Sequence, residues 1–541
     1  MSAEEKFSSS VSKYPHATDI IKSVESGELF FAVVGHVGSG ISEVANLLKN
    51  ELEEQGFDVS IIKASSAIKE WSIANDHEVP ADSQRALIED TFTYQNLGDF
   101  MREHTQDYAA VVQGMMKNVR KVRAEKTGVE LKEGAPIEPD DNNRAYIFDS
   151  IRHPAEVHLL RAVYHDSFSL IGVVCQEEIR MERLLDKFYD HSTRSDSSSK
   201  QKVDDLMQRD ADDKKNDHGQ HVAEAFFESD YFVDNTVHSE RDKENWQMPE
   251  MLGRLIDIKT HSRIIRPTIP EKAMHFAMTA QISSSCLSRQ VGAAIVDENG
   301  DIIATGANEV PKAGGGVYGK TFSFTDDGND DRCFHSKNKT CSSNVEQNKL
   351  AEKLSSSMPV VKGDSEVDTI SILRKAGLKD LLEFSRAVHA EMDAITTAAR
   401  TGRSLASAKM FVTTFPCHYC ARHLVASGIH EVQYIEPYPK SMAMSLHEDA
   451  ITSQEIDWVP PNQCDLDKKN LSNYQKVLFK PFVGVSPRLY ARAFTKDRSL
   501  KDKDTGLMNI GDPKWGNKWS IKRVSYTQLE AELTKELSHE V

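Results

Sequence analysis

This chain of 541 residues has few cysteines, no long apolar run and fewer positively than negatively charged side chains. Seven cysteines are too few and too scattered for a disulfide framework, which favours a reducing compartment. The longest apolar run, 29–34, is far too short to cross a bilayer, and residues 1–30 lack the apolar segment of a signal peptide. With 66 Lys and Arg against 83 Asp and Glu, the net charge of −17 argues against a long polynucleotide as the main ligand. We therefore expect a soluble cytoplasmic protein, and a small anionic nucleotide stays possible as a ligand.

Two short segments together hold the components of a hydrolytic zinc site. His389 and Glu391 are separated by one residue, and Cys417 and Cys420 by two. On one helical turn the two cysteines face the same way, and Pro416 just before them suits a helix start. A catalytic zinc takes three protein ligands and leaves one position open. The pattern H-x-E…P-C-x-x-C is typical of zinc-dependent nucleobase deaminases, so we predict Zn²⁺ on His389, Cys417 and Cys420, with Glu391 moving protons.

The two cysteines also fit two other kinds of site. A Cys-x-x-Cys pair also occurs as a redox pair or as half of a structural zinc site. A structural site needs four closing ligands, and a redox pair usually lies in a thioredoxin-like unit without an upstream His-x-Glu. A second metal site is conceivable on Cys333, His335 and Cys341, but their spacing is irregular and only three ligands are obvious, so a solvated polar loop is the preferred interpretation.

The N-terminal part alternates short apolar runs with charged, helix-favouring segments. This rhythm predicts a mainly parallel sheet with helices on both faces. The expected strands cover 29–34, 59–63, 146–149, 170–174 and 231–234. The polar stretch between Asp186 and Gly219 is interpreted as a lid or as surface helices.

The C-terminal part begins near Pro267 with a predicted helix over 273–283. Strands are expected at 291–296 and 301–306, joined by a hairpin turn that contains Asn299 and Gly300. Further strands are expected at 409–414 and 432–435, around the cysteine helix.

The predicted fold class is α/β, with a P-loop-like parallel-sheet domain followed by an α/β/α cytidine deaminase-like domain. The expected organisation is a tail (1–24), a nucleotide-kinase-like domain (25–237), a linker (238–266) and a deaminase domain (267–541) with an insertion (320–380) and a C-terminal extension.

A glycine-rich loop follows the first strand and opens a helix, as a phosphate-binding loop should. Its candidate nucleotide-binding residues are Gly35, Gly38, Ser39, Gly40 and Ser42. Ile41, however, occupies the position of the lysine that neutralises phosphate charge, so ordinary kinase or NTPase turnover is not expected. Nucleotide binding without turnover and a purely structural loop both stay open.

From Ser285 to about Ala450 the chain resembles deoxycytidylate deaminases of the cytidine deaminase superfamily. The segments that carry the resemblance are 285–293, 306–311, 389–391, 416–420 and 427–429. With a P-loop-like domain in front, the whole chain is similar to bacterial two-domain anti-phage deoxycytidylate deaminases. The resemblance implies a five-stranded sheet flanked by helices, one catalytic zinc and a free-nucleotide substrate.

The resemblance also suggests how substrate is held. Asn308 is the candidate for the deoxyribose, and Arg289 is a candidate for phosphate. The loop of Gly314, Gly315 and Gly316 is a second phosphate candidate, since bare backbone amides approach an anion closely, although a flexible turn is an equal alternative. Asp393 stands where an Asn is common in simple deoxycytidylate deaminases, which puts regulation by a deoxynucleoside triphosphate in doubt.

These features predict hydrolytic deamination of dCMP, dCTP or both to deoxyuridine nucleotides, with depletion of dCTP as an anti-phage defence. One alternative is a polynucleotide-editing cytidine deaminase. The other is a sensor or scaffold whose N-terminal domain binds a regulatory nucleotide, RNA or protein inhibitor. A homo-oligomer is expected from the resemblance.

Overall fold

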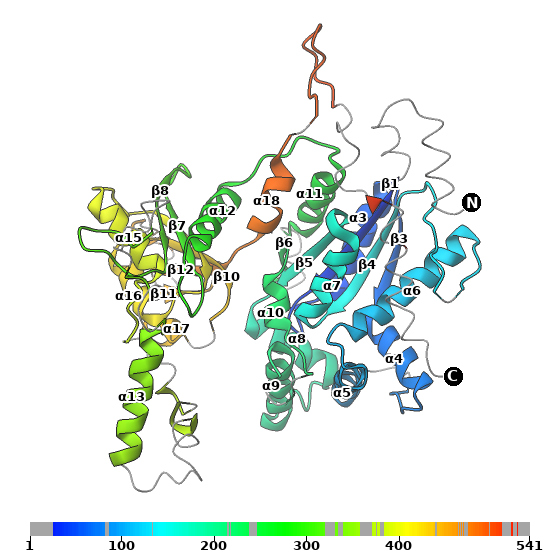
Figure 1. Ribbon diagram of the computed structural model, residues 1–541, viewed down its shortest axis with the longest axis horizontal. Helices are drawn as coiled ribbons and strands as arrows, with labels where there is room; N and C mark the ends of the chain where they lie inside the picture. The colour runs from blue at the N-terminus through cyan, green and yellow to red at the C-terminus, as the bar shows by residue number, and fades with distance from the viewer. Residues whose placement is uncertain are drawn as a thin grey trace. The chain divides into compact units, whose positions relative to one another are not determined.

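The chain divides into two compact units (Figure 1). The first unit comprises residues 1–266 and 483–541, and the second comprises residues 267–482. The computed structural model describes residues 25–81, 86–132, 134–213, 216, 218–236, 246–319, 331–333, 339–357, 371–374, 376–378, 384–438, 441–463, 465, 467, 469, 474–496, 498–510, 521–522 and 527. The expected tail 1–24 lies outside the described residues.

The first unit is built on a six-stranded sheet in the order β13-β6-β5-β2-β4-β3. All pairs are parallel except β13 with β6. Every residue of β2 is buried, because helices cover both faces of this central strand. The strands are β2 (Glu28–Val34), β3 (Asp58–Lys63), β4 (Arg144–Ile151), β5 (Phe168–Val174), β6 (Tyr231–Asp234) and β13 (Gly484–Val485), and a separate two-stranded sheet pairs β1 (Glu25–Ser26) with β14 (Ile521–Lys522).

Most helices of the first unit pack against its sheet, whereas α5, α8 and α9 share a separate apolar cluster. One apolar cluster joins α3, α11 and α18 to the sheet. Helices α6, α7 and α10 contact strands β3, β5 and β2, respectively (Figure 1). Helix α3 buries positions 41, 44, 45, 48 and 52, the spacing of one helical face. The helices are α3 (Ile41–Glu54), α4 (Ala64–Ala74), α5 (Ile88–Thr105), α6 (Ala110–Thr127), α7 (Pro154–Tyr164), η1 (His165–Ser167), α8 (Glu177–Phe188), α9 (Ser197–Ala211), α10 (Val222–Phe227), α11 (Met248–Thr260) and α18 (Pro487–Phe494).

Two expected boundaries are wrong. Residues 248–260 of the expected linker form α11, whose Leu252 and Leu255 are fully buried in the core of the first unit. The C-terminal extension does not complete the deaminase domain, because β13 pairs with β6 and Leu489 of α18 joins the same core. Apolar side chains of both segments therefore decide the boundary, which composition alone did not reveal.

The second unit contains a six-stranded sheet in the order β11-β12-β10-β9-β7-β8. Strands β11, β12, β10 and β9 are parallel, and β7 runs antiparallel to β9 and β8. The expected hairpin is present, and Gly300 has φ of 81°, a conformation that glycine adopts at little cost. The strands are β7 (Gly292–Val296), β8 (Ile302–Ala307), β9 (Lys409–Thr414), β10 (Glu431–Glu436), β11 (Ile451–Thr452) and β12 (Val477–Pro481).

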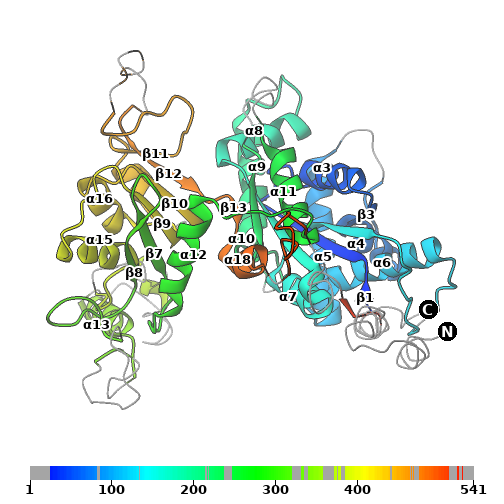
Figure 2. The same cartoon turned by 90° about the horizontal axis from the view of Figure 1, so that it is seen from above.

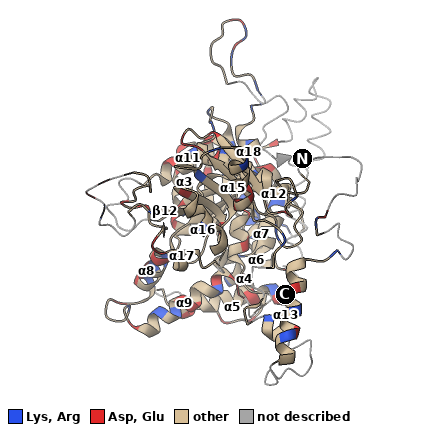
Figure 3. Ribbon diagram, turned by 90° about the vertical axis from the view of Figure 1, so that its left-hand side faces the viewer, with Lys and Arg blue, Asp and Glu red and all other residues tan. Residues whose placement is uncertain are grey.

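Helices lie on both faces of this sheet, with α12 on one face and α15 and α16 on the other (Figure 2). Thr268 and Glu271 form a capping box that starts α12. Lys and Glu residues alternate along the surface helix α13, and α9 of the first unit also carries both signs of charge (Figure 3). The helices are α12 (Ile269–Ile282), α13 (Ser342–Ser357), α15 (Ala390–Arg400), α16 (His418–Ala426) and α17 (Ala443–Leu446).

The predicted α/β fold class with two mostly parallel sheets is confirmed. The expectation of five strands in the second sheet is wrong, because the short edge strand β11 adds a sixth. Within the described residues, no helix combines the length and the apolar character needed to span a lipid bilayer.

Candidate metal centre and active site

Two helix starts bring the predicted zinc ligands together. His389 is the N-cap residue of α15, and Cys417 is the N-cap residue of α16, with Cys420 one turn further on. The β9 strand leads into the cysteine helix, so the sheet fixes where α16 begins. Both helix starts present the positive end of their dipole, which favours thiolate over thiol.

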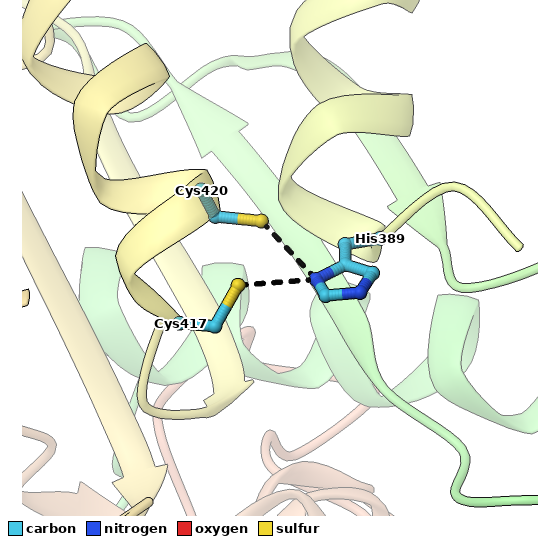
Figure 4. A group of neighbouring side chains, drawn as sticks. All are labelled: His389, Cys417 and Cys420. Carbon is cyan, nitrogen blue, oxygen red and sulfur yellow. Dashed lines mark hydrogen bonds between the residues drawn. The ribbon is translucent and has the colours of Figure 1, made fainter. Parts of the chain in front are cut away.

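The ligand atoms have the separation that a zinc ion requires. His389 Nδ1 lies 3.3 Å from Cys417 Sγ and 3.4 Å from Cys420 Sγ (Figure 4). Zinc bonds of about 2.0 Å to nitrogen and about 2.3 Å to sulfur, at a tetrahedral angle, place nitrogen and sulfur about 3.5 Å apart. Among the described residues, these three are the group of His, Cys, Asp and Glu side chains whose ligand atoms converge.

The three predicted ligand side chains are electrostatically coupled through the Cys417 sulfur. The Cys420 thiol and the His389 imidazole, both hydrogen-bonded to the Cys417 sulfur, lower the pKa of Cys417 to about 4. The hydrogen bond to Cys417 raises the pKa of His389 to about 9. A thiolate is the form of cysteine that binds metal, so Cys417 is ready as a ligand at neutral pH.

Glu391 lies beside the ligands without joining them. Its side chain is 4 % exposed, and burial raises the pKa of this carboxyl group. A carboxyl group whose pKa is shifted toward neutrality both takes up and releases protons at working pH. Glu391, His389 and Cys417 line one pocket with a volume of 410 Å³.

Two of the predicted substrate residues line the same pocket. The Asn308 amide is tied to the backbone, because its Oδ1 accepts from Val291 N at 2.6 Å and its Nδ2 donates to the Arg289 carbonyl at 2.5 Å. Arg289 also lines the pocket and forms an ion pair with Glu436 at the end of β10.

The glycine loop lies elsewhere. Gly314 and Gly315 are exposed, and none of the three glycines is among the residues that line the pocket. The loop is closed by two hydrogen bonds, from Lys312 N to the Gly316 carbonyl and from Gly315 N to the Lys312 carbonyl. The geometry therefore does not bring this loop together with the metal ligands.

The pocket contains two arginines that sequence reasoning missed. Arg374 and Arg386 come from the segment before α15, and both line the cavity. Arg386 donates to the Asp331 carbonyl at 3.2 Å, and Arg374 donates to the Asn348 side chain. Their positive charge was the available signal, but nothing in the spacing of this polar insertion linked them to the zinc ligands.

The second metal site has no support in the described residues. Cys333 and Cys341 line the pocket, but His335 lies outside the described part of the chain. Cys341 Sγ lies 3.7 Å from Ser288 Oγ, within a weak sulfur hydrogen bond.

Comparison with known proteins agrees with this site. Residues 267–436 match the family model described as the cytidine and deoxycytidylate deaminase zinc-binding region. The deoxycytidylate deaminase of Enterobacteria phage T4 is 31 % identical over 175 residues, which are 31 % of this chain and 78 % of the phage protein. The chain belongs to the cytidine and deoxycytidylate deaminase family. The zinc-binding region of the family is present, with its His, Cys and Cys ligands in place.

One further relative and two solved structures are similar to parts of this chain. ComE operon protein 2 of Bacillus subtilis (strain 168) is 33 % identical over 98 residues, which are 18 % of this chain and 48 % of that protein. The dCMP deaminase of cyanophage S-TIM5 in apo form is 18 % identical, with a TM-score of 0.21 over 40 % of this chain and 100 % of that chain. Shikimate kinase from Bacteroides thetaiotaomicron is 10 % identical, with a TM-score of 0.24 over 42 % of this chain and 98 % of that chain.

Proposed function

We propose that this deaminase converts free deoxycytidine nucleotides, dCMP and dCTP, to the corresponding deoxyuridine nucleotides. The observation that carries the proposal is the convergence of Glu391, His389 and Cys417 on one pocket of 410 Å³. This volume is in the range of small-molecule sites, which suits a single nucleotide. The naming of the phage T4 relative as a deoxycytidylate deaminase supports the same substrate class.

The chemistry follows from the residues around the cavity. His389, Cys417 and Cys420 would hold a zinc ion, which would supply a water-derived nucleophile at neutral pH for C4 of cytosine. Glu391 accepts the water proton on its carboxylate and delivers it to N3 of the ring. Glu391 then takes the remaining proton of the attacking water, which is carried by the oxygen now bonded to C4, and passes it to the amine. The C4–N bond breaks, ammonia leaves and the C4 carbonyl forms. The buried position of Glu391 keeps this proton transfer away from bulk solvent.

The positive charge in the pocket supports a phosphorylated substrate. Arg289, Arg374 and Arg386 line the cavity, and guanidinium groups bind phosphate through paired hydrogen bonds. In this proposal the three arginines bind the phosphate chain. Asn308 fixes the conformation of the segment that faces the sugar. Three cations leave room for a triphosphate, so dCTP is a substrate in this proposal.

The deciding experiment offers the zinc-loaded full-length protein equal concentrations of dCMP, dCTP, CTP and cytosine-containing single-stranded DNA. Mass spectrometry of the uracil products measures kcat/KM for each substrate, and the Glu391→Gln protein controls for contaminating activity. We expect both deoxynucleotides to exceed the DNA substrate by at least about 100-fold, a difference of about 2.7 kcal/mol in the activation barrier. Preferential formation of uracil in the DNA would instead establish a polynucleotide-editing enzyme.

The cellular role in this proposal is depletion of dCTP in the cytoplasm during phage infection, by an enzyme that works as a homo-oligomer under control of its first unit. Its test compares dCTP pools and plaque counts in infected cells that express the wild-type protein or Glu391→Gln at matched levels. Equal dCTP pools and equal plaque counts would refute the defence role, whereas the nucleotide assay above stands independently. Light scattering of the purified protein reads out the oligomeric state.

A further inference from the structure

A carboxylate group of the protein itself is bound at the glycine-rich loop of the first unit. The loop connects β2 to α3 at the carboxyl end of the central strand. Asp210, near the end of α9, accepts a hydrogen bond from the backbone N–H of Val37 in this loop at 2.7 Å. The same carboxylate accepts from Arg152 Nη1 at 2.6 Å, and its side chain is 2 % exposed. Backbone N–H groups of such loops ordinarily face phosphate oxygens, so the carboxylate takes a phosphate position.

Two guanidinium groups flank the loop. Arg152 Nη1 also donates to the Gly35 carbonyl at 3.2 Å, and Arg180 Nη1 donates to the Val37 carbonyl at 3.5 Å. Burial, reinforced by the charges of Arg180 and Arg152, lowers the pKa of His36 to about 3. Positive charge is thus concentrated at the loop although Ile41 replaces its lysine.

One polar side chain in the loop has no partner within the described part of the chain. The Ser39 hydroxyl is buried and makes no hydrogen bond there. A buried hydroxyl without a partner costs free energy, and a phosphoryl oxygen would satisfy it. Ser42 Oγ donates to Asp149 Oδ2 at 2.8 Å, which is the pair of residue types that holds Mg²⁺ in P-loop enzymes.

We propose that Asp210 is a resident anion that closes this loop, and that a polyphosphate or a nucleoside triphosphate binds by displacing it. Arg152 and Arg180 supply the positive charge that the missing lysine does not. Because Asp210 is carried by α9, occupancy of the loop is coupled to release of the end of this helix. The site is in the first unit and is independent of the proposed deaminase substrate.

The first experiment measures binding of inorganic tripolyphosphate to the full-length protein by isothermal titration calorimetry. Asp210→Asn removes the competing charge and keeps a hydrogen-bond acceptor of the same shape. We expect this variant to bind tripolyphosphate at least tenfold more tightly than the wild-type protein. The matched control is Asp205→Asn, because Asp205 lies on the same helix and is exposed, so the net charge changes equally. Equal gains in both variants would show that net charge alone is responsible and would overturn the proposal.

A double variant tests the contribution of Arg152 to tripolyphosphate binding. Asp210→Asn combined with Arg152→Gln neutralises both members of the buried pair, so neither charge is left without its partner. We expect the tenfold gain to be lost in this double variant. Persistence of the gain would overturn the role of Arg152.

Hydrogen–deuterium exchange on the wild-type protein gives a test that needs no substitution. Tripolyphosphate at saturating concentration should increase exchange of the amides near the end of α9, because Asp210 leaves the loop. Binding without a change in α9 would overturn the proposal. Absence of tripolyphosphate binding to both the wild-type protein and Asp210→Asn would do the same.

Discussion

The Asp393 carboxylate accepts a hydrogen bond from the backbone N–H of Ala307 across 3.2 Å. This contact ties α15, which follows the ligand His389, to the end of β8, directly before Asn308. Asp393 is 1 % exposed, so this buried carboxylate joins α15 to the segment that leads to Asn308 in the pocket wall.

Replacing Asp393 by Ala should leave the Ala307 N–H buried without this acceptor, at a cost of about 1–3 kcal/mol of folding stability. We also expect KM for dCMP to rise, because the neighbouring Asn308 segment loses its support. Denaturant unfolding and steady-state kinetics measure both effects. Asp393→Asn keeps an acceptor oxygen and should retain most stability; equal losses in both variants would contradict this role of the hydrogen bond.

Glu391→Gln should lower kcat by about 10²–10⁴-fold, because the amide cannot shuttle a proton. Zinc content, measured by mass spectrometry of the purified protein, should stay at the wild-type level, since Glu391 is not a ligand. Loss of zinc together with activity would mean that Glu391 belongs to the metal shell.

Cys417→Ser and Cys420→Ser should each lose zinc, and with it activity. Structural and catalytic zinc sites depend on their full set of ligands, and weaker binding makes the metal removable by chelators. The matched control is Cys286→Ser, since Cys286 lines the same pocket but stands outside the ligand cluster. Zinc retained by a Cys417 or Cys420 variant during dialysis against a chelator would show that the ligand set is wrong.

Arg123 and Glu28 form a buried ion pair in the first unit. Arg123 Nε and Nη2 donate to the two carboxylate oxygens at 2.9 and 2.8 Å, and the side chains are 0 % and 1 % exposed. Arg123→Met should destabilise the unit by about 3–5 kcal/mol, because the buried Glu28 carboxylate loses the guanidinium group that pairs with it. Lys121→Met on the same helix breaks an exposed pair with Glu70 and should cost at most about 1 kcal/mol. Denaturant unfolding followed by a probe in the first unit distinguishes the two; similar losses would contradict the reasoning from burial.

The stability of the first unit should depend on pH through Lys259. Burial, with a smaller contribution from the charge of Arg492, lowers the pKa of this amine to about 7, while its Nζ donates to the carbonyl of Asp166 at 2.5 Å. Between pH 7 and the usual lysine pKa, the unfolded chain binds a proton that the folded protein does not. The contribution of Lys259 to stability therefore rises with pH in this window, by up to about 1.4 kcal/mol per pH unit.

The control for this prediction is Lys259→Met, which removes the titrating group. We expect the difference in unfolding free energy between wild type and variant to change from pH 7.5 to 9, in favour of the wild type. Parallel pH profiles would refute the low pKa of Lys259.

The sequence alone determined the features that depend on neighbouring residues. Cys417 and Cys420 share one helix start because of their spacing, and Pro416 favours that start. The apolar runs of the N-terminal part form strands β2 to β6, and the turn that contains Asn299 and Gly300 forms the hairpin. Local sequence patterns determine both kinds of element. The three residues that converge, His389, Cys417 and Cys420, were predictable for the same reason, because two short motifs carry all of them.

Only the tertiary structure decided which distant segments meet. Arg374 and Arg386 reach the pocket, Asp210 reaches the loop before α3, and Leu489 joins the first core through contacts between residues far apart in sequence. Such contacts depend on which apolar faces and charged groups pack together in the folded chain. The spacing of residues along the sequence does not reveal them. The glycine loop at 314–316 illustrates the limit, since its composition suited an anion but the fold placed it outside the pocket.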